Sequence, residues 1–259
     1  SWIPYGWSMF LAKNNYQPNG ISILHFDDHK DMMSPKIGLY GTDWKDMLTH
    51  ASVDMGAPET IKQAVLSGAI TLGSMMTPLL HHLNRIDVFH LAHGVSNTAM
   101  NIDPTTIADY MLEPGRRRMA VDISSSLTSA HGGVSRYLRA AEIAEIANAI
   151  HPKMDIFLHI DMDYFNNRYN GSDEWRHRPA RNDQPLGLQK ENISRICDSL
   201  VRAGIAKRIS HVSIGISPSF YPSEYWEEAI TYLIHGLVAC GLPATDLLKY
   251  IETARRNEV

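Results

Sequence analysis

The chain has 259 residues, of which 44% are apolar and 20% charged, and its formal net charge is −4 at pH 7. This composition is ordinary for a globular domain of enzyme size, and the slightly acidic balance argues against a nucleic-acid partner, which usually needs a basic face. No apolar run approaches the roughly 18 residues of a membrane-spanning helix, so we expect no membrane partner. The two cysteines, Cys197 and Cys240, fall in helix-like stretches and are interpreted as buried thiols of a cytoplasmic protein.

Short runs rich in Ile and Val alternate with longer segments of helical periodicity. The runs predict interior strands of a parallel sheet, and prolines near helix starts and glycines after helix ends support the helices. In chain order we expect strand Ile21–Phe26, helix Pro58–Leu66, strand Ile86–Leu91, helix Val134–Ile150, strand Ile156–Ile160, helix Leu188–Ala203, strand His211–Ile216 and helices Ser223–Cys240 and Pro243–Arg256. The alternation predicts a single α/β domain over residues 1–259, a three-layer α/β/α sandwich with a mostly parallel central sheet.

One long polar stretch interrupts this alternation, at Asn166–Pro185. A loop of that length usually has a function or is disordered. Trp175 lies within it, beside two arginines and a histidine. Such a loop could hold an extended peptide, so Trp175 is our candidate for an aromatic substrate contact.

Two acidic clusters stand where predicted strands end. Asp27, Asp28, His29 and Asp31 follow the first strand, and Asp161 and Asp163 follow Ile156–Ile160. In open α/β sheets ligands bind beyond the carboxyl ends of the strands, and alternate residues of an extended chain point the same way. Buried carboxylates this close need a cation, although a solvated loop would also accommodate them. Oxygen ligands with one nitrogen suit Mn²⁺, or a two-metal site, better than a structural zinc.

The motifs support a family resemblance. The stretch DDHKD, read as DxHxD, followed far downstream by DMD, read as DxD, resembles the ureohydrolase (arginase/agmatinase) superfamily. The overall pattern looks most like the peptide arginases of ribosomal-peptide biosynthesis, which are similar in size and open with a Trp-containing segment like SWIPYGW. The resemblance implies an arginase-like metallohydrolase with a precursor peptide as substrate, and it leaves a homo-oligomer open.

The resemblance also implies roles for the clustered residues. Asp27 and Asp161 would bridge two Mn²⁺ ions, Asp31 would complete the shell of one ion, and His29 and Asp163 would bind the other. A water held between the ions would become hydroxide near neutral pH and attack the guanidinium carbon. The products would be urea and an ornithine side chain.

The sequence departs from the superfamily in three places. The additional metal-binding His of a Gly-Gly-Asp-His-Ser motif is missing; we expect it before Ser1, or expect His25 or another histidine to replace it. The proton-shuttling His has no clean counterpart, and His93 is our substitute, with a structural role as its alternative. For the guanidinium-binding acid we expect Glu224, or otherwise Asp28 or an acid of the loop Asn166–Pro185.

Two other functions stay open. One is a hydrolase of a free amidino or acylated-amine small molecule, and the other is a non-catalytic, metal-containing peptide-binding protein. Asp163 favours two metals over the single zinc of the deacetylases that share this fold, which carry a His there. The stretch Tyr164–Asn167 lacks the further acid of small-substrate arginases, which disfavours free arginine as the substrate.

Overall fold

The computed structural model describes residues 2–14, 20–94, 97–109, 115–124, 135–169 and 183–247. Its internal contacts divide the chain into two compact units. The first unit comprises Ser1–Ser22, His29–Val88 and Thr98–Arg139, and the second comprises Ile23–Asp28, Phe89–Asn97 and Ala140–Val259. In the part of the chain that is described, no helix is long and apolar enough to cross a membrane.

The fold is α/β, with a large mixed sheet. The strands are β1 (Ile21–Phe26), β2 (Ile37–Tyr40), β3 (Asp43–Asp46), β4 (Ile86–Leu91), β5 (Thr98–Asp109), β6 (Arg116–Ser124), β7 (Ser135–Ala140), β8 (Asp155–Asp161) and β9 (Ile209–Gly215), hydrogen-bonded in the order β3-β2-β6-β5-β7-β4-β1-β8-β9. The expectation of a mostly parallel sheet is wrong, because β2–β3, β2–β6, β5–β6 and β5–β7 are antiparallel pairs, whereas β8–β9 is parallel.

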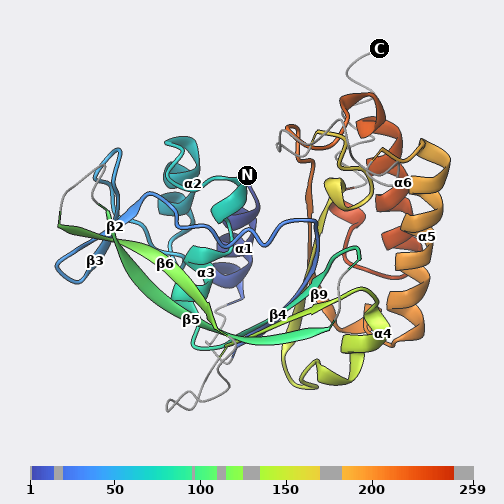
Figure 1. Cartoon of the computed structure of the whole chain (residues 1–259), viewed down its shortest axis with the longest axis horizontal. Helices are drawn as coiled ribbons and strands as arrows, with labels where there is room; N and C mark the ends of the chain where they lie inside the picture. The colour runs from blue at the N-terminus through green and yellow to red at the C-terminus, as the bar shows by residue number, and fades with distance from the viewer. Residues whose placement is uncertain are drawn as a thin grey trace. The chain divides into compact units, whose positions relative to one another are not determined.

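The first unit is built on an antiparallel ribbon. Strands β5 and β6 pair continuously from Asn101↔Ser124 to Asp109↔Arg116 and form the long twisted ribbon of Figure 1. Helix α3 (Thr77–His82) packs against this ribbon, and α1 (Ile3–Lys13) packs against α2 (Pro58–Leu66). Trp7 and Ile61 are completely buried in this unit.

One predicted helix of the chain is wrong. Val134–Ile150 was expected to be helical, but Ser135–Ala140 forms β7 and only Ile143–Ile146 forms a helix, α4, followed by a 3-10 turn at Ala147–Ala149. Strand β7 pairs with β5, with Ile102 opposite Ser135. This tertiary pairing overrides the local preference that predicted a helix here.

The second unit combines parallel strands with two long helices. Strand β8 pairs with β9, and its last residue, Asp161, stands opposite Gly215. Helices α5 (Leu186–Arg202) and α6 (Trp226–Ala239) pack side by side (Figure 1). Most of the last predicted helix, Pro243–Arg256, lies outside the described residues.

Candidate metal centre

The second unit buries a pair of polar side chains at the end of β1. Every residue of this strand is buried, His25 included, and Asp27 follows directly with 1% of its surface exposed. Because residues two apart on an extended chain share a face, His25 and Asp27 point the same way. Their side chains meet, with His25 Nε2 3.5 Å from Asp27 Oδ2.

Strand β8 ends in the same spacing. His159 is fully buried in the strand, and Asp161, two residues later, is 4% exposed. Asp161 caps the following 3-10 turn, Met162–Tyr164, by accepting a hydrogen bond from the backbone nitrogen of Asp163 at 3.3 Å. The same turn carries Asp163, which is 1% exposed.

These side chains converge within the second unit. His25, Asp27 and His159 each offer a ligand atom within 4.8 Å of the others, as do Asp27, His159 and Asp161. Asp27 also lies within this distance of Asp163. Three buried carboxylates and two buried imidazoles therefore occupy a small volume, and this set of oxygen and nitrogen donors suits a divalent transition-metal ion.

A hydrogen-bond chain orients the imidazole of His159. The Ser213 hydroxyl donates to the Leu158 carbonyl at 3.3 Å, so it accepts from the Nδ1–H of His159, also at 3.3 Å. This assignment places the imidazole lone pair on Nε2. Burial lowers the pKa of His159 to about 3, so the ring is neutral at physiological pH, which is the form that binds metals.

A third histidine supports the first pair. The ring of His90 lies 4.9 Å from that of His25, and His25 in turn stacks on His159 at 5.1 Å between ring centroids. His90 Nε2 donates to the backbone carbonyl of Asp27 at 2.8 Å. The bond fixes the backbone where β1 ends, which limits how far the Asp27 carboxylate can move.

A glycine gives the Asp161 carboxylate its space. A Cβ atom added at Gly215 would lie 2.5 Å from Oδ2 of Asp161 and 3.0 Å from its Cγ. Such distances are far below van der Waals contact. The position opposite Asp161 therefore requires a residue without a side chain.

The five metal ligands predicted from the sequence divide between the two units. Asp27, Asp161 and Asp163 come together in the second unit, as described above. His29 and Asp31 belong to the first unit. Asp31 has a φ of 54°, in the left-handed region that aspartate tolerates better than most residues, and its carbonyl accepts a hydrogen bond from Met76 at 3.1 Å.

The proposed proton shuttle, His93, has well-defined contacts in the second unit. Its Nε2 donates to the backbone carbonyl of Tyr164 at 2.7 Å, and its ring stacks on the Tyr164 ring with centroids 4.2 Å apart. These contacts match the structural role that was the alternative interpretation of this histidine.

The predicted substrate-binding residues that the structure describes each have their own hydrogen-bond partner. Glu224 is exposed and accepts a hydrogen bond from the guanidinium of Arg168, which lowers the pKa of its carboxyl group. Asp28 accepts a hydrogen bond from the amide of Asn167 at 2.8 Å. Trp175 lies outside the described residues.

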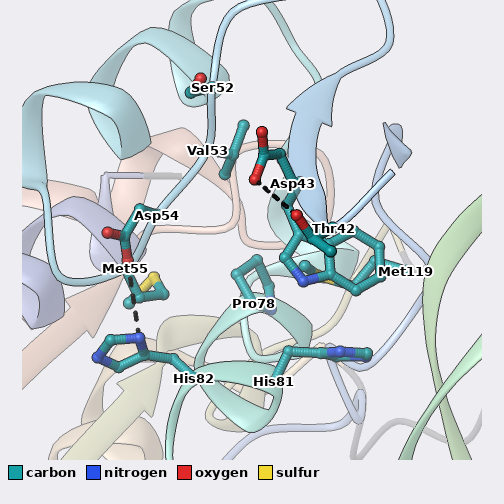
Figure 2. A pocket seen from close by; sticks show the side chains of 11 residues that line it. Thr42, Asp43, Ser52, Val53, Asp54, Met55, Pro78, His81, His82 and Met119 are labelled. Atoms are coloured by element: carbon teal, nitrogen blue, oxygen red, sulfur yellow. Dashed lines mark hydrogen bonds and ion pairs between the residues drawn. The ribbon is translucent and has the colours of Figure 1, made fainter. Parts of the chain in front are cut away.

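The first unit contains a cavity of about 420 Å³. Figure 2 shows the Asp54 carboxyl turned toward His82, whose Nδ1 is 3.8 Å from Oδ1, and the Thr42 hydroxyl donating to Asp43 at 3.3 Å. The indole of Trp44 contributes to its wall. No lysine or arginine among the described residues lines this cavity. Two carboxylates beside an indole suit a positively charged group.

Sequence reasoning missed His159 as a member of the centre and named His25 only as a substitute. A signal for both exists, since each acidic strand end carries the same His-x-Asp spacing, HFD at residues 25–27 and HID at residues 159–161. Both histidines sit within apolar runs, where a core position is the more common interpretation.

No family model matches the sequence, and no curated protein matches it.

Proposed function

We propose that the chain is a manganese-dependent hydrolase that converts arginine side chains of a peptide to ornithine and releases urea. The observation that carries this proposal is the buried group of carboxylates at the ends of β1 and β8 in the second unit, Asp27, Asp161 and Asp163. The order of these residues along the chain is the one that the DxHxD and DxD motifs require. An arginase-like three-layer arrangement belongs to the same proposal.

The oxygen-rich donor set of the second unit suits Mn²⁺. Asp27, Asp161 and Asp163 of the second unit would hold the metal. The bound ions would neutralise the carboxylate charge and supply a hydroxide nucleophile near neutral pH. In this arrangement Ser213 and His90 act indirectly, by orienting His159 and the Asp27 backbone.

The guanidinium of a substrate presents five donors and needs carboxylate or carbonyl acceptors. Asp28, directly after Asp27, is the better candidate to accept from it, because its present partner is the neutral amide of Asn167. Glu224 already binds the guanidinium of Arg168, and a substrate would have to displace that contact. The backbone hydrogen bond of His93 gives its Nε2 proton a partner, so we assign the proton transfer to no residue.

Urea release by the manganese-loaded protein tests the proposal, with an arginine-containing peptide and free arginine in parallel. We expect urea from the peptide, and a loss of at least 100-fold in Asp161→Asn, because that variant removes a negatively charged ligand of the proposed metal. Asp155→Asn is the matched control, since Asp155 is exposed at the start of the same strand. Two bound metal ions without urea from either substrate would refute the proposal.

A second candidate function rests on the histidines. His25, His159 and Asp27 form a set of two imidazoles and one carboxylate, which is a donor set of catalytic zinc sites. This set favours hydrolysis of an acylated amine at a single zinc. Metal content separates the two candidates: one zinc with release of acetate from an acetylated amine supports the second, and two manganese ions with urea support the first.

A further inference from the structure

The second unit contains a pocket of about 180 Å³ beside helix α5. Phe26 contributes to its wall and directly follows His25 in β1, and neighbouring residues of a strand point to opposite faces of the sheet. The pocket is therefore separate from the candidate metal centre. The lining of the pocket combines apolar with polar side chains. The apolar ones are Phe26, Leu91, Ile143 and Ile196. The polar ones are His93, Glu142, Tyr164, Arg195 and Ser199.

The most buried polar group in the pocket is the phenol of Tyr164. Only 6% of this residue is exposed, and its ring packs edge-on against Phe26 and Phe165. Within the described parts of the chain its hydroxyl has no hydrogen-bond partner. Tyr164 lines the pocket, so a ligand there can bond to this hydroxyl without displacing a protein partner.

Arg195 supplies the positive charge of the pocket. It extends from α5 and forms no ion pair with any described residue, and both its charge and that of Glu142 act on the Tyr164 phenol. The Ser199 hydroxyl, one helical turn further, donates to the Arg195 carbonyl at 2.7 Å. A planar guanidinium next to a phenol hydroxyl is well suited to a carboxylate, which accepts from both.

Glu142 and His93 supply acceptors in the same pocket. The Glu142 carboxylate accepts the backbone N–H of Glu145 as part of a capping box, and its remaining lone pairs can accept from an ammonium group. His93 donates through Nε2 to Tyr164, which places its lone pair on Nδ1. The pocket therefore offers donors for an anion and acceptors for a cation within one small volume.

We propose that this pocket binds a free α-amino acid with a small apolar side chain. Its carboxylate binds Arg195 and the Tyr164 hydroxyl, its ammonium binds Glu142, and its side chain contacts Phe26 and Leu91. The volume corresponds to about six water molecules, which suits a molecule the size of alanine. The terminus of a peptide would carry either the ammonium or the carboxylate, but not both. A free amino acid therefore matches the two charged groups of the pocket better than a peptide terminus does. The proposal is independent of the proposed hydrolase activity.

Calorimetric titration of the metal-free protein tests the ligand class. We expect L-alanine to bind saturably with a dissociation constant of about 1 mM, and propionate and ethylamine, which each lack one charged group, to bind at least about tenfold more weakly. Equal binding of propionate and L-alanine would overturn the zwitterion assignment. Absence of saturable binding up to about 10 mM L-alanine would overturn the site itself.

Variants locate the binding. Arg195→Gln should weaken L-alanine binding at least about tenfold, and Tyr164→Phe, which keeps the ring packing, about fivefold. Lys207→Gln is the matched control, because it removes one positive charge from an exposed position of the 3-10 turn Ala206–Arg208 and should leave the affinity unchanged. If Arg195→Gln does not fold, the affinity of Tyr164→Phe for L-alanine tests the proposal instead. Unchanged affinity in the folded variants would refute the proposal.

Discussion

At the scale of single residues, Gly215 controls the position of the Asp161 carboxylate. In Gly215→Ala the new Cβ would overlap Oδ2 of Asp161, so the carboxylate has to rotate away. We expect the affinity for Mn²⁺ to fall at least about tenfold, as for the loss of a ligand-orienting contact. Equilibrium dialysis measures this directly.

The control for this change is Gly187→Ala. Gly187 lies in the first turn of α5 in the same unit, and an added Cβ meets nothing within 4 Å. Manganese affinity should be unchanged there. Equal affinities of Gly215→Ala and the wild type would show that Asp161 is not a ligand, or that it can bind in a second orientation.

A second prediction concerns Ser213, which accepts the Nδ1–H of His159. Ser213→Ala removes that acceptor, so the imidazole loses its preferred orientation and tautomer. Losses of this kind typically cost 10–100-fold in metal affinity, and we expect about tenfold here. Ser210→Ala is the control, because Ser210 is in the same strand and donates to the Ile156 carbonyl at 3.3 Å without contacting a histidine. A metal affinity that is the same in both variants would exclude His159 from the centre.

The carboxylates of the candidate centre could be predicted from the sequence, whereas His159 was not. Asp27, Asp161 and Asp163 stand at the ends of apolar runs, where carboxylates are conspicuous. His159 lies inside such a run, and a buried histidine is chemically ambiguous until its partner is known. Its partner Ser213 is 54 residues away in sequence, so no local pattern connects them.

At the scale of secondary-structure elements, the packing of α5 against α6 depends on a few buried side chains. Leu200 of α5 is fully buried, and Leu200→Ala should lower the free energy of unfolding by about 2–5 kcal/mol, since it removes apolar contacts and leaves a cavity. Val201 is the next residue and is 50% exposed, so Val201→Ala should change stability by less than about 1 kcal/mol. Urea denaturation followed by circular dichroism compares the two. Equal losses would mean that α5 does not pack as described.

Helices and strands that follow a single sequence pattern along their whole length could be predicted. The strand Ile21–Phe26 and the helix Pro58–Leu66 have the expected bounds, because the first is buried along its whole length and the second begins at a proline. Strands β5 and β6 were missed because they are only partly buried, and such strands lack the continuous apolar runs that indicate interior strands. The strand β7 owes its conformation to pairing with β5, which no local signal reports.

At the scale of the whole molecule, the α/β class followed from the alternation of strands and helices. The directions of the strands did not, because an antiparallel ribbon and a crossover differ in long-range pairing and not in composition. The division into two compact units was equally invisible, since two of its boundaries fall inside the apolar runs of β1 and β4. Global arrangement thus depends on contacts that residue patterns do not encode.

The acid stability of the molecule should depend on His211 in β9. Burial lowers the pKa of this imidazole to about 4, below the value of about 6.5 for an unfolded chain. The native state therefore keeps His211 neutral, and the unfolded state binds a proton first as the pH falls. The resulting stabilisation is complete above pH 6.5 and is lost as the pH falls toward 4, at about 1.4 kcal/mol per pH unit.

The variant His211→Gln removes this proton linkage and tests the sign of the effect. In metal-free protein, the wild type should lose about 2 kcal/mol more unfolding free energy than His211→Gln between pH 6.5 and pH 4.5. His235→Gln is the control, because His235 is an exposed residue of α6. The acid sensitivity of this variant should match that of the wild type. Since burial lowers the pKa of His159 in the same direction, the variant should remain partly acid-sensitive. A pH dependence identical in all three proteins would mean that His211 is hydrated in the native state.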